Sequence, residues 1–238
     1  RGIQSAEQLN LKLHGLIPAQ QLKGLSQAVT LLDAAIDQGT RILIVGDFDA
    51  DGATSTALMV LALRRMGAQV DYLVPDRFKY GYGLTPEIVA LAIQDFQPEL
   101  IVTVDNGISS HVGVDAAHAA GIQVIITDHH LTSKNVPECA AVVNPNQPNC
   151  DFPSKALAGV GVAFYVLATL STQRKQHGKA GENLAQYLDI VALGTVADVA
   201  QLDQNNRILV AAGIERIRHS ACRPGILALL EVASREPS

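Results

Sequence analysis

Short runs of apolar and β-branched residues recur along the first two thirds of the chain and alternate with longer segments of mixed polarity. The clearest runs are RILIVG at 41–46, QVDYLVP at 69–75, LIVTV at 100–104, IQVIIT at 122–127 and AAVVNP at 140–145. Runs of this length that are apolar throughout are typical of parallel strands buried on both faces. The pattern therefore predicts an α/β fold with a parallel β-sheet of about five strands flanked by helices.

The segments between these runs carry the boundary signals of helices. Residues 85–96 begin with Thr85 as a helix cap and Pro86 at the first helical position, and residues 109–121 end on Gly121, a common helix stop. After residue 150 no further strand-like run occurs, and helices are predicted over 154–171, 183–197, 204–218 and 224–234. The C-terminal part is therefore expected to be all-helical.

This pattern divides the chain into three parts. Residues 1–38 are expected to form an N-terminal helical segment packed on the core, residues 39–150 the α/β core, and residues 151–238 the helical remainder. The polar, basic stretch at 171–183 is expected to be an exposed loop between two helices rather than a binding patch.

The composition is that of a globular protein, with 238 residues, 48% of them hydrophobic and 17% charged, and a formal net charge of -5. This charge argues against a protein that coats duplex nucleic acid, but it does not exclude a nucleic-acid substrate, because an acidic metal site can mask a local basic groove. Three cysteines without close pairs indicate neither a zinc cluster nor a disulfide framework, and no run reaches the ~18 apolar residues of a membrane span. These features predict a cytoplasmic protein without membrane association.

Acidic residues and histidines follow three of the predicted strands, at the place where each strand ends. They are Asp47, Asp49 and Asp51 after the first strand, Asp105 after the third, and Asp128, His129 and His130 after the fourth. In open α/β sheets ligands bind beyond the carboxyl ends of the strands, because loops and helix N-termini converge there. A single such acid is as often a cap or turn residue as a functional group, but the three groups together predict one site.

Carboxylates gathered in one cleft need a compensating cation, since otherwise they repel and some stay protonated. Carboxylate oxygens mixed with imidazole nitrogen suit Mn²⁺ or Mg²⁺, and no nearby thiolate favours zinc. A site this rich in aspartate is able to hold two ions, the arrangement that activates a water and clamps a phosphoryl group. The pattern therefore indicates metal-assisted phosphoester hydrolysis and makes 39–150 a metal-binding core.

The stretch GDFDADGATST at 46–56 also matches the start of a calcium-binding EF-hand loop. With Asp47 in the first position, the twelfth position needs a bidentate glutamate, but Leu58 stands there. The stretch also follows a predicted strand, whereas an EF-hand loop follows a helix. These two features argue against an EF-hand.

The motifs GDFDADG, VDNG and TDHH, in this order, and ALGTVADVAQLDQNNRILV at 192–210 resemble the four motifs of the DHH phosphoesterase superfamily. PDRFKYGYGL and VVNPNQPNCDFPSKALAGVGVAFYVL are similar to its branch of bacterial exonucleases specific for single-stranded DNA. The resemblance covers almost the whole chain. It implies a hydrolase that requires Mg²⁺ or Mn²⁺, holds two ions, and removes nucleotides from a 5′ end of single-stranded DNA in repair and recombination.

The resemblance also implies roles for individual residues. Metal ligands are implied at Asp49, Asp51, Asp105, His129 and Asp198, with Asp47 as a neighbouring acid of the first motif. His130 is expected to face the scissile phosphate or the metal-bound water, and Asp128 to orient the histidines. The implied catalytic set is Asp49, Asp105, Asp128 and His130.

Two departures from the family pattern are visible. Many members carry a metal-binding histidine four residues before the middle aspartate of the first motif, where this chain has Val45. Either Asp47 takes over this duty or one ion is held more weakly. Members of the exonuclease branch continue into a substrate-binding domain and an oligonucleotide-binding fold, whereas this sequence ends at Ser238, so we expect the catalytic domain alone. In full-length members, single-strand-binding protein and a helicase are the implied partners.

The loop PDRFKYGYG at 75–83 interleaves cationic and aromatic residues, which is the usual chemistry of single-strand binding. Arg77 is expected to hold a terminal 5′ phosphate, with Lys79 and Tyr80 beside the strand. Asn106 and His111, close to Asp105 in sequence, are further candidates for substrate contact. The alternatives are a loop whose aromatics pack inwards, a turn-forming asparagine and an ordinary exposed histidine.

Gly159 and Gly161 in LAGVGVAFYV are expected to let a helix pack tightly beneath the site.

Two other functions stay open on the sequence alone. A small-molecule phosphatase, pyrophosphatase or short-oligonucleotide hydrolase on the same scaffold would suit the negative net charge. A non-catalytic DHH scaffold would bind partners in a replication or repair assembly, although such a protein is expected to have lost ligands, and only the position of Val45 departs from the motifs.

Overall fold

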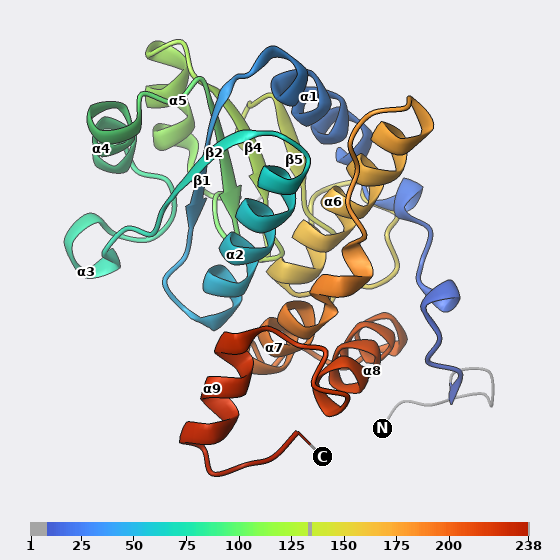
Figure 1. Cartoon of the computed structure of the whole chain (residues 1–238). Coiled ribbons are helices and arrows are strands. Elements are labelled where there is room, and N and C mark those ends of the chain that lie inside the picture. Colours follow the sequence, from blue (N-terminus) through green and yellow to red (C-terminus); the bar gives the residue numbers. More distant parts are fainter. Residues whose placement is uncertain (1–8, 133–134, 238) are drawn as a thin grey trace.

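Five parallel strands form the central sheet of the computed structural model, which describes residues 9–132 and 135–237. The strands are β1 (Arg41–Gly46), β2 (Gln69–Leu73), β3 (Leu100–Val104), β4 (Gln123–Thr127) and β5 (Ala141–Val143), in the spatial order β2-β1-β3-β4-β5. Every neighbouring pair runs parallel. The predicted parallel sheet is therefore confirmed (Figure 1).

Helices cover both faces of this sheet (Figure 1). One face carries α1 (Leu25–Gln38), α2 (Ala50–Arg65) and α6 (Gly159–Gln176), and the other carries α4 (Pro86–Phe96) and α5 (His111–Ala119). Alternate residues of β1 point to the two faces of the sheet. Ile42 and Ile44 pack in the hydrophobic layer with α1, α2 and α6, and Leu43 and Val45 pack in the layer with α4 and α5. The unbroken apolar run from Ile42 to Val45 follows from this burial on both sides.

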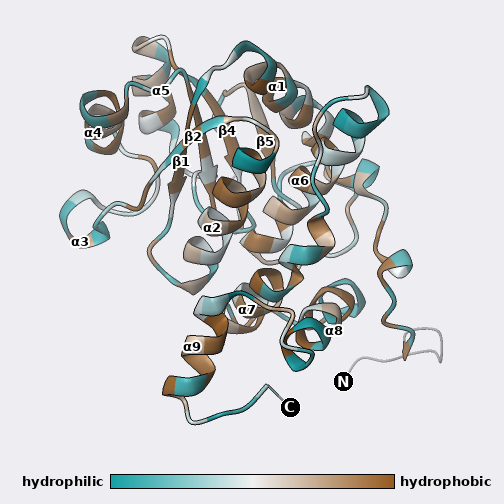
Figure 2. Cartoon of the chain, in the orientation of Figure 1, coloured by the Kyte–Doolittle hydropathy of each residue, from teal (hydrophilic) through white to brown (hydrophobic). Residues whose placement is uncertain are grey.

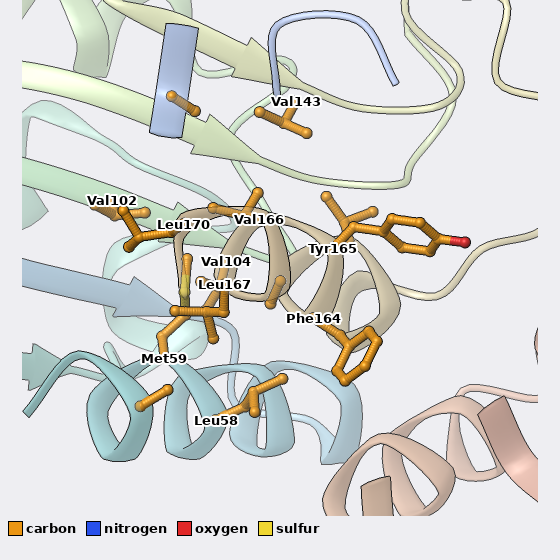
Figure 3. Close-up of a cluster of buried hydrophobic side chains, with 14 of the residues drawn as sticks. Leu58, Met59, Val102, Val104, Val143, Phe164, Tyr165, Val166, Leu167 and Leu170 are labelled. Atoms are coloured by element: carbon orange, nitrogen blue, oxygen red, sulfur yellow. The ribbon is translucent and has the colours of Figure 1, made fainter. Parts of the chain in front are cut away.

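The larger hydrophobic layer joins α2 and α6 to the sheet. Figure 3 shows Leu58 and Met59 of α2 near Val104 of β3 and Leu167 of α6. Each of these four side chains is fully buried, and burial of a side chain of this size stabilises the fold by about 1.5–3 kcal/mol. Leu58, which stands where an EF-hand would need glutamate, is therefore a core residue.

The described part of the chain after β5 is helical, as predicted. Besides α6 it contains the short 3-10 helix η4 (Leu184–Tyr187) and the helices α7 (Leu188–Ala197), α8 (Gln204–Arg218) and α9 (Pro224–Val232). Helix α7 packs against α2 and α6, and α8 packs against α7. Figure 2 shows that hydrophobic residues concentrate on the strands of the sheet. Within residues 9–132 and 135–237, no helix combines the length and the apolar character needed to span a membrane.

Only the second half of the stretch 171–183 is the loop that its polarity predicts, since residues 177–183 connect α6 to η4. Helix α6 continues through Gln176, and Arg174 near its end is only 4% exposed. A guanidinium nitrogen of Arg174 lies 2.5 Å from Asp33 and 3.1 Å from Asp37 on α1, and Lys179 contacts the same two carboxylates. The prediction was wrong for residues 171–176, because charges that pair inside a protein cannot be distinguished, in the sequence, from charges that face water.

The described residues before β1 begin with two short 3-10 helices, η2 (Leu13–Gly15) and η3 (Ala19–Gln21), which precede α1. Between them, the backbone N–H of Ile17 donates to Asn205 of α8 at 3.1 Å, and the Ile17 carbonyl accepts from Tyr165 of α6. Residues 1–8 of the predicted N-terminal segment lie outside the described residues. The division of the chain at residues 38 and 150 stays a prediction.

The order of the strands reverses between β1 and β3. The chain passes from β1 to β2 on one side and then to β3 on the other side of β1. The two connections leave in opposite directions, and in open α/β sheets ligands bind beyond the carboxyl ends of the strands at such a point. Asp47 directly follows β1 and Asp105 directly follows β3, which places both residues at this point of the sheet.

Candidate metal centre

The first acidic motif leads from β1 directly into α2. Asp49 is the N-cap of α2, and its Oδ1 accepts a hydrogen bond from the N–H of Gly52 at 2.9 Å. An acid in this position accepts a hydrogen bond from an otherwise unpaired backbone N–H, and its negative charge interacts favourably with the positive end of the helix dipole. Because the Asp49 side chain is exposed, it is also available to a cation.

Asp47, by contrast, is 7% exposed and already has a cationic partner. Its Oδ1 accepts from the N–H of Phe48 at 2.7 Å, and its Oδ2 lies 2.6 Å from a guanidinium nitrogen of Arg77. Arg77 opens the one-turn helix α3 (Arg77–Tyr80), which follows β2. A buried carboxylate is costly without such a partner, and Arg77 supplies the cation that Asp47 needs.

Asp51 is 1% exposed and is held by the start of a distant helix. Its Oδ2 accepts from the N–H of Gly159 at 2.7 Å and its Oδ1 from the N–H of Val160 at 2.8 Å, both in the first turn of α6. Burial raises the pKa of Asp51 to about 6, although the Val160 and Gly159 N–H groups oppose this rise. The α6 N-terminus therefore fixes the orientation of this carboxylate.

Gly159 is needed because Asp105 lies directly against it. A Cβ added at Gly159 would lie 2.6 Å from Asp105 Oδ1, which is closer than van der Waals contact allows. The absence of a side chain lets α6 approach both Asp51 and Asp105. The expectation that Gly159 permits close packing of a helix beneath the site is confirmed.

Asp105 and His129 bring two buried polar atoms together without a hydrogen bond. Asp105 Oδ1 lies 3.1 Å from His129 Nε2, and Asp51 Oδ2 lies 3.8 Å from the same nitrogen. Within the described residues, neither Asp105 Oδ1 nor His129 Nε2 has a partner of hydrogen-bond geometry. Such orphaned atoms are expected where a metal ion completes the contacts.

The ionisation of this pair reflects burial and mutual attraction. Burial raises the pKa of Asp105 to about 7, although the imidazole of His129 opposes the rise. Burial lowers the pKa of His129, but Asp105, Asp51 and Asp198 outweigh it and bring that pKa to about 9. The three acids around His129 therefore favour the protonated form of its imidazole.

Asp128 is fully buried and orients both histidines of its motif. Its Oδ1 accepts from the N–H groups of His129 and His130, at 2.7 and 3.1 Å, and lies 2.8 Å from His130 Nδ1. Its Oδ2 accepts from the N–H of Ile108 at 2.9 Å. Burial opposes ionisation of Asp128, but the bonds from His130 and Ile108 outweigh it, so its pKa lies below the ordinary value. The bond from Asp128 raises the pKa of His130.

Asp198 caps the C-terminal end of α7 and is half-buried, and burial raises its pKa. It completes a cluster in which ligand atoms lie within 4.8 Å of one another in each of three overlapping groups. The groups are Asp105 with His129 and His130, Asp51 with His129 and Asp198, and Asp47 with Asp49 and Asp105. All residues predicted as metal ligands are therefore brought together. Carboxylates with imidazole fit Mn²⁺ or Mg²⁺.

Val45 turns away from this cluster. Its side chain is 1% exposed and packs in the hydrophobic layer beneath α4 and α5, while its carbonyl accepts from the side chain of Asn106 at 3.1 Å. Of the two alternatives for this departure, the grouping of Asp47 with Asp49 and Asp105 favours a role for Asp47. An ion bound there would have to compete with Arg77 for this carboxylate.

The residues predicted to contact DNA lie in different surroundings. Arg77 reaches the centre, and Lys79 lies exposed with its Nζ 4.7 Å from the ring centroid of Tyr80. Tyr80 is partly buried and packs against the α4/α5 layer. Residues 77–80 of the predicted loop form the one-turn helix α3, and contact of Lys79 and Tyr80 with DNA stays a prediction.

Asn106 and His111 belong to none of the groups of ligand atoms among the described residues, and their contact with a substrate stays a prediction. Asn106 is 2% exposed, and its amide donates to the carbonyls of Val45 and Val104, which ties the ends of β1 and β3 together. His111 is exposed at the start of α5 and lines a separate pocket with Lys23 and Glu138.

Two residues beside the centre were not among the predicted site residues. Phe48, between Asp47 and Asp49, has 46% of its surface exposed. Tyr82 lies with its hydroxyl 3.3 Å from the Asp105 carbonyl and 3.2 Å from His130 Nδ1. The signal for Phe48 was its position between two acids, and for Tyr82 the glycines on either side, Gly81 and Gly83, which have φ of 80° and 79°.

Comparison with known proteins agrees with this geometry. A model of the DHH family, N-terminal domain, matches residues 41–195. The single-stranded-DNA-specific exonuclease RecJ of Escherichia coli (strain K12) is 56% identical over 243 residues, which cover 99% of this chain and 42% of that protein. RecJ of Bacillus subtilis (strain 168) is 39% identical, with 98% of this chain and 29% of that protein covered. The chain thus spans less than half the length of these curated relatives.

Solved structures show the same relationship. A crystal structure of exonuclease RecJ bound to manganese matches with a TM-score of 0.81 and 36% identity, over 93% of this chain and 55% of that chain. RecJ from Thermus thermophilus in complex with Mn²⁺ matches with a TM-score of 0.75 and 35% identity, over 94% of this chain and 31% of that chain.

Proposed function

The chain belongs to the DHH family, and on that premise we propose that it is the catalytic core of a metal-dependent exonuclease that hydrolyses single-stranded DNA in the 5′ to 3′ direction. The observation that carries the proposal is the convergence of the ligand-type side chains of four motifs into three overlapping groups. Relatives that share more than half of their aligned residues with this chain are named single-stranded-DNA-specific exonucleases.

The cofactor in this proposal is a pair of Mn²⁺ or Mg²⁺ ions. Matching RecJ structures contain manganese or magnesium. The ions would supply Lewis-acid activation of the phosphodiester and of the attacking water. The residues proposed to hold them are Asp47, Asp49, Asp51, Asp105, His129 and Asp198.

The remaining residues of the motifs, Asp128 and His130, would position a side chain and donate a hydrogen bond to the substrate. His130 is half-exposed, and its Nδ1 is held by Asp128, a contact that raises the pKa of His130. It would donate to a phosphoryl oxygen as negative charge develops there. Asp128 is buried and would act through His130, as a positioning residue.

The proposed substrate is single-stranded DNA with a free 5′ end, acted on in DNA repair and recombination. Single-strand-binding protein and a helicase are the proposed partners of a longer protein that contains this chain. A cytoplasmic location follows from the same proposal, because a bacterial enzyme of this kind would meet its substrate there.

The test is hydrolysis in the presence of Mn²⁺ by the 238-residue chain. The substrates are single strands labelled at the 5′ or 3′ end, the matching duplex, a dinucleotide and pyrophosphate. We expect release of mononucleotides from the 5′ end of the single strand and little from the duplex. Cleavage of only the dinucleotide or pyrophosphate would favour a small-substrate hydrolase, and no cleavage together with no Mn²⁺ binding by calorimetry would favour a non-catalytic scaffold.

A further inference from the structure

Two exposed phenylalanines stand directly beside the proposed metal centre. Phe48 is 46% exposed and lies between Asp47 and Asp49, and Phe78 of α3 is 90% exposed. Their ring centroids are 6.2 Å apart in an edge-to-face arrangement. The chain has only five phenylalanines, so two of them gather at this one place on the surface.

The pair is held in place by polar contacts rather than by a hydrophobic core. The guanidinium carbon of Arg77 lies 3.9 Å from the ring centroid of Phe48 while Arg77 also binds Asp47. Asp76 caps α3 by accepting from the N–H of Phe78 at 2.9 Å. Arg77 therefore covers one part of Phe48 and fixes its position, whereas Phe78 presents its ring almost entirely to solvent.

The chemistry around the pair points to one kind of occupant. The segment of Phe78 carries the cations Arg77 and Lys79, and the two sequence neighbours of Phe48, Asp47 and Asp49, belong to one group of ligand atoms with Asp105. A ligand that combines a flat apolar ring with a phosphate would match both features. Two rings are too small a patch for a stable protein interface, which buries about 800 Å² on each partner.

We propose that Phe48 and Phe78 form a nucleobase-stacking subsite, with Phe78 offering the open ring face, for the nucleotide next to the phosphodiester at the metal centre. The inference rests on the proposed function and deepens it by assigning base contact to residues other than Tyr80. Stacking on an aromatic face tolerates any base, so the subsite would hold DNA without sequence preference.

A tryptophan reporter tests the contact directly, because the chain contains no tryptophan. The variant Phe78→Trp is titrated in EDTA with a ten-residue oligothymidylate and with an abasic strand of the same length. We expect the oligothymidylate to quench the fluorescence and the abasic strand to leave it nearly unchanged. The control is Tyr72→Trp on β2, a residue that is 54% exposed and belongs to none of the groups of ligand atoms among the described residues, where neither strand should quench.

A kinetic measurement tests the same contact without a new fluorophore. In Mn²⁺, the ratio of kcat/KM for oligothymidylate to that for the abasic strand should fall about tenfold in Phe78→Ala and stay unchanged in Tyr72→Ala. Equal quenching of Phe78→Trp by both strands, or an unchanged ratio in Phe78→Ala, would overturn the subsite.

The two proposals fail in different ways. Hydrolysis of oligothymidylate from its 5′ end with no base-dependent quenching would leave the proposed function standing and remove the subsite. Base-dependent quenching in a protein that hydrolyses neither strand would support the subsite and count against the exonuclease.

Discussion

The guanidinium of Arg77 lies 2.6 Å from the Asp47 carboxylate, so a side chain from the segment after β2 neutralises an acid of the first metal-binding motif. Asp47 is 7% exposed at its side chain and Arg77 is 34% exposed. Asp47 also belongs to the group with Asp49 and Asp105. Arg77 and a divalent cation would therefore compete for one carboxylate.

We predict that Arg77→Gln lowers the stability of the metal-free protein and increases the stabilisation by Mn²⁺. Removing Arg77 leaves Asp47 with only the N–H of Phe48, which should cost about 1–2 kcal/mol for a partly exposed pair, or roughly 2–8 °C in Tm for a chain of this length. The ion then binds a carboxylate that no longer has a competitor. Thermal melts in EDTA and in Mn²⁺ measure both effects.

The matched control for this prediction is Arg64→Gln. Arg64 pairs with Asp71 at 3.4 Å, but both side chains are more than half exposed, so this change should move Tm by no more than about 2 °C in either buffer. Equal Mn²⁺ stabilisation of the wild type and Arg77→Gln would show that Asp47 takes no part in binding the ion.

We predict that Asp49→Asn abolishes Mn²⁺-dependent hydrolysis and leaves the fold intact. Asparagine caps a helix about as well as aspartate, so the bond to the N–H of Gly52 is kept while the charge is lost. Hydrolysis should fall more than about 100-fold, with stability in EDTA within about 0.5 kcal/mol of the wild type. Rate assays, Mn²⁺ calorimetry and urea unfolding measure these quantities.

Asp203→Asn is the control for Asp49→Asn, because Asp203 caps α8 with the same geometry. Its Oδ1 accepts from the N–H of Asn206 at 2.9 Å, but it belongs to none of the metal-binding groups among the described residues. Activity should be kept in this variant. If Asp49→Asn also kept most of its activity, Asp49 would be a helix cap and no more.

We predict that Gly159→Ala weakens Mn²⁺ binding through Asp105. The added Cβ would lie 2.6 Å from Asp105 Oδ1 and 2.8 Å from Asp105 Cβ, so either α6 or Asp105 must move. Overpacking of this kind costs about 1–3 kcal/mol, and the movement should separate Asp51, which α6 holds, from Asp105. Calorimetry with Mn²⁺ and urea unfolding measure the two effects.

The control glycine is Gly225 in α9, where an added Cβ would meet no atom within 4 Å. Gly225→Ala should leave Mn²⁺ binding unchanged and stability equal or slightly higher, since alanine favours a helix more than glycine does. Unchanged Mn²⁺ affinity in Gly159→Ala would mean that the approach of α6 does not control the position of Asp105.

The sheet and the cluster of acids were predictable from the sequence because each rests on a local pattern. β-branched runs mark buried parallel strands, and the carboxyl ends of such strands meet at one edge, so the acids after β1, β3 and β4 had to lie close together. The contact between Asp51 and the N–H of Gly159 was not predictable, since it joins residues 108 positions apart and depends on how α6 packs.

The sequence also could not show which aromatic side chains of the segment 75–83 are buried and which are exposed. Helix α3 has a single turn, which is too short for a hydrophobic period to show which side is buried. In the structure Tyr80 is partly buried against the α4/α5 layer, whereas Phe78, two residues earlier, is 90% exposed.

We predict that the ion pair between Asp33 and Arg174 stabilises the fold in a pH-dependent way. Burial raises the pKa of Asp33, but its bonds to Lys179 and Arg174 outweigh this and hold that pKa below the ordinary 3.8. A group whose pKa is lower in the folded state stabilises the protein above its unfolded pKa, and this stabilisation is lost as the pH falls through the folded value. Asp33→Asn should therefore cost about 2–4 kcal/mol at pH 7, because it leaves Arg174, which is 4% exposed, without its closest carboxylate. Urea unfolding of both proteins from pH 7 downwards should show the difference in the free energy of unfolding narrowing only below about pH 4.

The control variant is Asp71→Asn, which removes the exposed partner of Arg64 and should change stability by less than about 0.5 kcal/mol at every pH. A difference between wild type and Asp33→Asn that stays constant down to about pH 3 would mean that the Asp33 side chain acts by packing or neutral hydrogen bonding rather than by its charge.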